Sequence, residues 1–180
     1  MKLVAVNIVA LYIGWFACVL GAAYQYPLMG PCVVVGILAL HFYLVADFPR
    51  TSEVQLILTV GLLGFLLDSA QASLGAFSFP GMAGTSWRSP LWMVALWMAF
   101  ATTLHTSLRW LSGQYVLAAV LGVIGGPLSY YAGAQLGALQ LSTDLSFSLS
   151  VIATAWGIAM PLMVWLATAN TRHSAYTQNV

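Results

Sequence analysis

Six long apolar runs make up most of this 180-residue chain, and they constrain its fold more than any other feature. An α-helix needs about 20 predominantly apolar residues to cross a bilayer core of about 30 Å. We therefore predict an all-α, polytopic membrane protein, a single domain built as a bundle of six transmembrane helices. The predicted spans are residues 3–23, 28–46, 54–75, 90–108, 115–138 and 147–168, and a short, frayed cytoplasmic tail follows over 169–180.

Composition excludes the main alternatives to a membrane fold. Only 5% of the residues are charged, against about 25% in soluble domains, and so apolar a chain does not stay disordered. The net charge of +1 provides no basic surface for nucleic acid. A cleaved signal peptide over residues 1–23 is the competing interpretation of the first run, which is longer than the 7–15 apolar residues typical of such peptides.

The basic residues predict the orientation of the spans, because Lys and Arg concentrate in cytoplasmic loops. With the N-terminus in the cytoplasm, Lys2, Arg50, Arg109 and Arg172 all fall on the cytoplasmic side, and Arg88 alone falls outside. Six spans then return the C-terminus to the cytoplasm.

Several local patterns mark helix boundaries and contacts. Ser89 before Pro90 is typical of an N-cap followed by proline at the first helical position, and Asp144 marks another helix start. The fifth span is rich in small residues, and Gly133 and Gly137 match the GxxxG pattern of close helix packing.

Asp68 is the strongest single polar signal within a predicted span. A carboxylate at membrane depth costs roughly 2.5–3.5 kcal/mol on insertion scales, so we expect its side chain to face protein or water. One interpretation is a proton, cation or polar lipid site; the other is a structural Asp that locks helix contacts by hydrogen bonds. The same helix stripe carries Gly61, Gly64, Gln71 or Ala72, and Gly75.

A second group of polar residues is expected near the cytoplasmic ends of the spans. Counting from the span ends at 1.5 Å per residue places Asn7, His41 and His105 within about 10 Å of that boundary. Arg109 follows His105 by four residues, which predicts a shared helix face. The group either lines a polar pocket open to the cytoplasm or consists of interfacial side chains that reach for water. The polar stretch 47–53, with Asp47, Arg50 and Glu53, is expected outside the bilayer on the same side.

The sequence predicts no cofactor and no metal site. Two histidines at one depth are compatible with haem ligation, but they lie near the interface, and no HExxH spacing is present. Cys18 and Cys32 lie at similar depths on adjacent spans, where they are either bonded or, as we expect, free thiols that pack as small apolar residues.

Four sequence segments, taken together, resemble a bacterial inner-membrane family known as domain of unknown function 2878. The segments are WFACVLGA at 15–22, GFLLDS at 64–69, the stretch from Pro90 to Trp110, and GGPLSYYAG at 125–133. The resemblance covers about residues 7–141 and implies no catalytic residues. It implies a bacterial inner (cytoplasmic) membrane location and a context of fatty-acyl-chain modification, which is an association and not a mechanism.

Three functions follow as hypotheses, and whether the protein is an enzyme is left open. The first is an accessory or lipid-handling component of fatty-acyl-chain modification, with membrane lipids and lipid-modifying enzymes as partners. The second is a membrane-embedded enzyme that acts on lipid. The third is a small proton-coupled transporter that uses Asp68. The candidate catalytic residues are His41, His105 and Arg109, and the candidate binding residues are Asp68, Gln71 and Asn7.

Overall fold

The computed structural model describes residues 2–44, 50–80 and 88–177, with side chains as far as Ala169. Its described part contains six α-helices, as predicted, of which four are long and apolar enough to cross a membrane. The helices are α1 (Lys2–Ala23), α2 (Met29–Leu44), α3 (Arg50–Ser73), α4 (Leu91–Leu104), α5 (Tyr115–Gln135) and α6 (Leu145–Thr177). The shorter apolar helices are α2 and α4.

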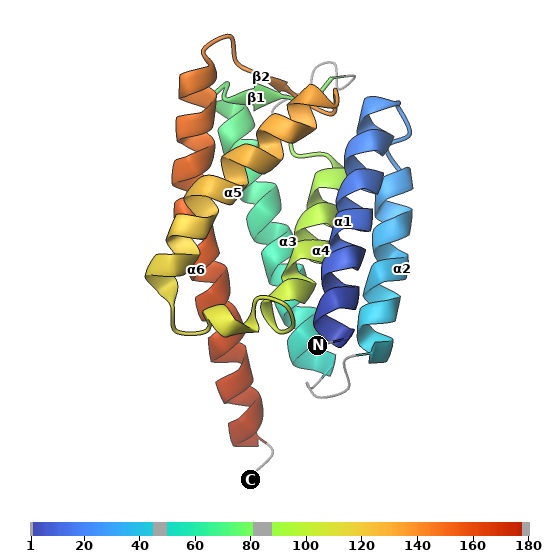
Figure 1. The fold of residues 1–180 in the computed structure, drawn as a ribbon, viewed down its shortest axis with the longest axis vertical. Helices are drawn as coiled ribbons and strands as arrows, with labels where there is room; N and C mark the ends of the chain where they lie inside the picture. The colour runs from blue at the N-terminus through green and yellow to red at the C-terminus, as the bar shows by residue number, and fades with distance from the viewer. Residues whose placement is uncertain (1, 45–49, 81–87, 178–180) are drawn as a thin grey trace.

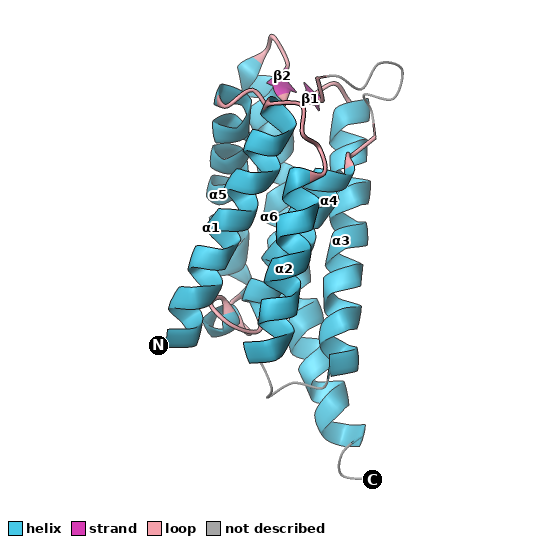
Figure 2. Ribbon diagram, turned by 90° about the vertical axis from the view of Figure 1, so that its right-hand side faces the viewer, coloured by secondary structure: helices cyan, strands magenta, loops and turns pink. Residues whose placement is uncertain are grey.

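The helices form a bundle with both chain ends at the same end of the molecule (Figure 1). Helices α1, α2 and α4 pack against one another, and α3 packs between α4 and α6. Helix α5 runs obliquely over α6 (Figure 1) and is linked to α1 by a 2.9 Å hydrogen bond from Trp15 Nε1 to Ser129 Oγ. Figure 2 shows α1 and α2 side by side on one face.

A short antiparallel pair of strands closes the end of the bundle opposite the termini (Figure 2). Strand β1 (Phe77–Ser78) pairs with β2 (Gln140–Leu141), and Phe77 lies opposite Leu141. The predicted loop between the third and fourth spans therefore contributes ordered structure, which its turn-forming residues did not indicate. The part of this loop over 81–87 lies outside the described residues.

The predicted spans 54–75 and 115–138 extend past the ends of α3 and α5, because a glycine terminates each helix before the predicted end. Gly75 and Gly137 have φ values of +77° and +87°. They follow α3 and α5, where the next amide, of Ala76 or Ala138, bonds back to a carbonyl five residues earlier. This is the usual helix-ending role of a left-handed glycine. The predicted stripe therefore ends before Gly75, and the GxxxG match at Gly133 and Gly137 is not a helix-packing motif.

The fourth predicted span also ends early, at Leu104 instead of residue 108. Thr102 and Thr103 donate their hydroxyls to the carbonyls of Ala99 and Phe100, an arrangement that competes with helix continuation. A short 3₁₀ helix, η1 (Arg109–Leu111), follows. At the start of α4, Pro90 occupies the N-cap position and no side chain caps the helix, so the predicted Ser89 cap is wrong.

The sixth helix differs from its prediction at one end only. Asp144 Oδ1 accepts a 3.0 Å hydrogen bond from the Phe147 amide, which confirms the predicted helix start. At the other end, α6 continues to Thr177, through much of the segment predicted to be a frayed tail.

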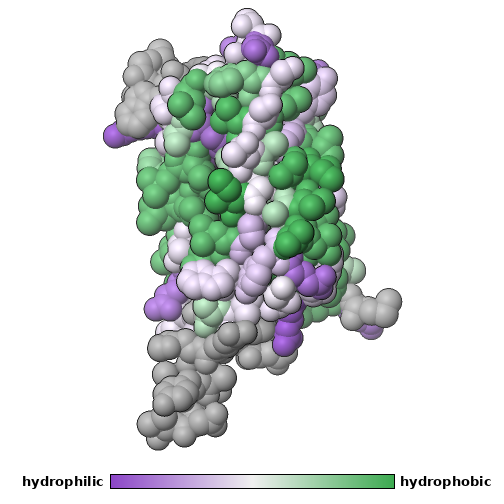
Figure 3. Space-filling view, turned by 90° about the vertical axis from the view of Figure 1, so that its left-hand side faces the viewer, coloured by the Kyte–Doolittle hydropathy of each residue, from purple (hydrophilic) through white to green (hydrophobic). Residues whose placement is uncertain are grey.

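Apolar side chains are abundant on the outside of the bundle as well as inside it. Exposed positions include Val9 on α1, Val35 on α2, Leu62 on α3 and Val116 on α5. Figure 3 shows that hydrophobic side chains dominate the middle of one face and that hydrophilic ones gather at its two ends. This distribution is typical of helices that face lipid.

Close helix contacts in the interior depend on particular glycines. A Cβ atom at Gly64 would lie 2.0 Å from the indole ring of Trp97 on α4. A Cβ atom at Gly122 would lie 2.3 Å from the Trp156 carbonyl oxygen, and one at Gly126 equally close to its indole ring. The small residues of α5 therefore provide tight packing against α6.

We expect Gly64→Ala to lower the free energy of unfolding by about 1–3 kcal/mol, because the added methyl group overlaps a ring that cannot move freely. Gly36→Ala is the matched control, since no atom lies within 4 Å of a Cβ at that helical position. The control should leave stability unchanged or raise it by up to about 1 kcal/mol. Thermal unfolding of the purified variants in detergent measures both; equal stabilities would contradict the packing at Gly64.

Candidate functional site

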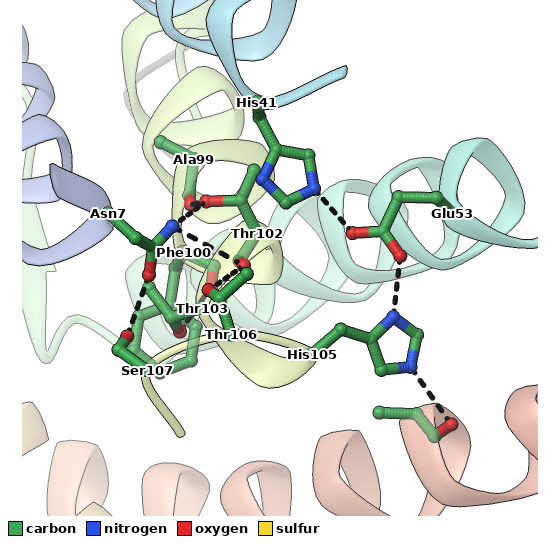
Figure 4. Close-up of polar contacts among 11 residues, drawn as sticks. Asn7, His41, Glu53, Ala99, Phe100, Thr102, Thr103, His105, Thr106 and Ser107 are labelled. Carbon is green, nitrogen blue, oxygen red and sulfur yellow. Dashed lines mark hydrogen bonds and ion pairs between the residues drawn. The ribbon is translucent and has the colours of Figure 1, made fainter. Parts of the chain in front are cut away.

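A buried carboxylate, Glu53, forms the centre of a polar cluster (Figure 4) where α3 begins, at the end of the bundle that carries the termini (Figure 1). Glu53 lies in the first turn of α3 and is only 2% exposed. Its Oε1 lies 2.7 Å from His41 Nε2 on α2, and its Oε2 lies 2.5 Å from His105 Nδ1, just after α4. One side chain therefore joins three helices, and we call these three residues the His–Glu–His cluster.

One assignment of protons satisfies all the contacts of the His–Glu–His cluster. His105 Nε2 lies 3.1 Å from the Ala167 carbonyl oxygen of α6, which only accepts. The two contacts to Glu53 and this third contact need three protons. Two neutral imidazoles supply one each, so one further proton is shared between Glu53 and His105. The cluster as a whole is then neutral, which suits its burial.

Glu53 is the residue of the cluster that sequence reasoning did not single out as a candidate. The stretch 47–53 was expected outside the bilayer, which remains a prediction; within it, α3 begins at Arg50 and buries the Glu53 side chain in the protein. The missed signal is periodicity: stepping back from Asp68 through Gly64, Gly61 and Ile57 in threes and fours leads to Glu53. All five lie on the buried face of α3.

Arg109 does not belong to the cluster in the way predicted. The prediction required one continuous helix from His105 to Arg109, but α4 ends at Leu104 and Arg109 opens η1. The Arg109 side chain is exposed, whereas that of His105 is buried. The expected grouping of Asn7, His41 and His105 at one end of the bundle is confirmed (Figure 4).

A second polar network, centred on Asn7, lies beside the cluster (Figure 4). Asn7 Nδ2 donates to Thr102 Oγ1 over 3.1 Å, and Ser107 Oγ donates to Asn7 Oδ1 over 2.7 Å. Thr106 donates its hydroxyl to the Thr102 carbonyl oxygen. These contacts attach the start of α1 to the end of α4.

A small groove between α1, α2 and α4 borders both the His–Glu–His cluster and the polar network centred on Asn7. Its floor consists of the buried side chains of Asn7, His41 and Thr102, together with the half-buried Thr106. Its sides are apolar and come from α1 and α2; four of the side residues are exposed, Ala10 is half-buried and Ile37 is buried. These side residues are Leu3, Val6, Ala10, Ile37, Leu40 and Leu44. We call this feature the α1–α2 groove.

Asp68 forms a separate polar contact toward the other end of α3. At 1.5 Å per residue, the separation of fifteen residue steps from Glu53 to Asp68 corresponds to about 22 Å. Asp68 is fully buried, accepts a 2.7 Å hydrogen bond from Trp97 Nε1 and accepts another from the Tyr130 hydroxyl. The predicted inward orientation is confirmed, and the two partners come from α4 and α5.

The other candidate residues of the sequence do not join these sites. Gln71 is buried, one turn beyond Asp68, and donates to the Leu67 carbonyl oxygen of its own helix. Cys18 and Cys32 are free thiols, as expected. Within residues 2–44, 50–80 and 88–169, no group of three or more His, Cys, Asp or Glu side chains is arranged to hold a metal ion.

The fold and these networks define an all-helical protein with helices suited to a membrane and with buried acids at both ends of its central helix. The model of the family described as Protein of unknown function (DUF2878) matches residues 4–162, so the chain belongs to this family. The resemblance noted in the sequence is thereby confirmed. No curated protein and no solved structure matches the chain.

Proposed function

We propose that the protein spans the bacterial inner membrane six times, with both ends in the cytoplasm. The apolar exterior and the basic residues near the terminal end of the bundle support this topology. Helices α2 and α4 contain 16 and 14 residues, about 24 and 21 Å at 1.5 Å per residue. Both are shorter than a bilayer core of about 30 Å.

Reporter fusions test this topology directly. A fusion after Val180 and a fusion in the loop near Gly81 should report opposite sides of the membrane, with the C-terminal fusion in the cytoplasm. An external C-terminus, or two fusions on the same side, would contradict the six-span arrangement.

Within that topology, we propose a lipid-handling function that serves fatty-acyl-chain modification. The observation that carries this proposal is the α1–α2 groove, whose partly exposed apolar sides meet a mostly buried polar floor. An amphiphile matches this pattern, because its chain stays against Leu3, Val6 and Leu40 while its polar end reaches Asn7 and His41. Small-molecule sites commonly combine apolar walls with a few fixed polar groups.

A second candidate function is catalysis at the same groove. The observation in its favour is the Glu53–His41 contact, since a carboxylate that orients an imidazole is a common way to prepare a general base. Transport through Asp68 has less support, because both carboxylate oxygens already accept hydrogen bonds from Trp97 and Tyr130.

Deletion of the gene, followed by lipid analysis, tests the lipid-handling proposal. We expect the deletion to change the acyl-chain profile and the wild-type gene to restore it. Ala10→Trp, which fills the α1–α2 groove, should fail to restore the profile. Ala39→Trp should restore it, because this exposed alanine of α2 lies outside the groove. An unchanged profile, or full restoration by Ala10→Trp at normal protein level, would contradict the proposal.

A further inference from the structure

We propose that the ligand of the α1–α2 groove is an acidic amphiphile, whose head group passes its proton to His41. This inference rests on the proposed lipid-handling function and specifies its ligand. The chemistry is that of a long alkyl chain with an oxygen acid at its end, either a carboxylic acid or a phosphate monoester.

His41 belongs to the groove and to the His–Glu–His cluster at once. In the tautomer whose Nε2 donates to Glu53 over 2.7 Å, the neutral imidazole carries a lone pair on Nδ1. Figure 4 shows this second ring nitrogen turned toward the side where Asn7 and Thr102 lie. Among the described residues, no hydrogen bond reaches it. His41 is 6% exposed, so the head group of a ligand that contacts Nδ1 loses its contact with water.

The Nδ1 lone pair of His41 accepts a proton, so the ligand that suits it best is an acid. The O–H bond of the acid breaks, its proton binds Nδ1, and the bonding electrons remain on the head-group oxygen. The resulting imidazolium donates to that anion through Nδ1 and to Glu53 through Nε2. A buried ion pair is stable only when further hydrogen bonds satisfy its members, and Glu53 supplies this support.

The charges around His41 favour an anion in the groove. Glu53 faces it from α3, and in the proton assignment given above its charge is offset by the proton shared with His105 beyond α4. Helix α1 contributes only the neutral Asn7 to the floor. Lys2, Arg50 and Arg109 are exposed and open α1, α3 and η1, so the described charges nearest the cluster and outside it are positive.

Binding of matched twelve-carbon probes to the full-length protein in nanodiscs tests the inference. We expect lauric acid to bind at least about tenfold more tightly than 1-dodecanol, because only the acid forms a charged hydrogen bond. Monododecyl phosphate is the third probe: stronger binding than laurate identifies a phosphate head group, and weaker binding a carboxylate. Ala39→Trp should leave all affinities unchanged.

His41→Gln separates the inference from the proposed function. Glutamine still donates to Glu53 but accepts no proton, so the preference for acid over alcohol should fall about tenfold to near parity while dodecanol binding persists. The carboxyl carbon resonance of ¹³C-labelled laurate should report an ionised head group bound to the wild type and a neutral one bound to His41→Gln. Equal affinities of acid and alcohol for the wild type would overturn the inference alone. Absence of binding by all three probes would overturn the proposed function as well.

Discussion

Glu53→Leu is expected to lower the free energy of unfolding by about 3–5 kcal/mol, the usual effect of removing one partner from a buried charged pair. The substitution leaves His41 without its Nε2 partner and His105 without its Nδ1 partner, and both imidazoles are buried. Because these contacts join α2, α3 and the end of α4, the loss should appear as a lower midpoint of thermal unfolding in detergent.

Two comparison variants identify the cause of that loss. Glu53→Gln should be milder, since its amide still bonds to both imidazoles in suitable tautomers. The triple variant Glu53→Leu, His41→Leu and His105→Leu should be more stable than Glu53→Leu alone, because no buried polar ring is left unpaired. If Glu53→Leu unfolds at the wild-type temperature, the His–Glu–His cluster does not form.

Asp68→Leu is expected to destabilise the protein by about 2–6 kcal/mol, since each of two buried donors loses its acceptor at about 1–3 kcal/mol. The donors are Trp97 Nε1 and the Tyr130 hydroxyl, which bring α4 and α5 against α3. Trp97 also stacks on Trp156 with ring centroids 4.6 Å apart, so the disturbance should extend to α6.

Asp68→Asn distinguishes a structural role from a titrating one. Asparagine keeps an acceptor for Trp97 and places an amide beside the Tyr130 oxygen, so most of the stability should remain. The acyl-lipid profile of a complemented deletion strain should then be normal with Asp68→Asn and abnormal with Asp68→Leu. Equal loss of function in both variants, with normal protein levels, would instead indicate that Asp68 exchanges a proton.

The sequence predicts the six helices well because long apolar runs have few other outcomes. The inward orientation of Asp68 was also predictable, since a carboxylate is too costly to face lipid. Glu53 was not, because it lies in the most polar stretch of the chain, where composition favours exposure. Its burial depends on two histidines that come from other helices, one of them 52 residues further along the chain.

Other features depend on contacts that no local pattern encodes. The end of α4 at Leu104 reflects threonine hydroxyls that bond to their own helix, and for this reason His105 and Arg109 do not share one continuous helix. Trp97 and Tyr130 were assigned to no site, since an aromatic residue in an apolar span is usually a packing residue. Only the helix arrangement brings their polar atoms to Asp68.

Photocrosslinking with a long-chain fatty acid that carries a diazirine next to its carboxyl group tests the central claim, that a lipid head group binds in the α1–α2 groove. In membranes containing the wild-type protein, we expect label on peptides covering residues 3–10 and 37–44, which form both sides of the groove. Ala10→Trp should remove that label and Ala39→Trp should retain it. Label of equal yield in Ala10→Trp, or label confined to exposed lipid-facing positions such as Leu58 and Leu62 of α3, would contradict the account.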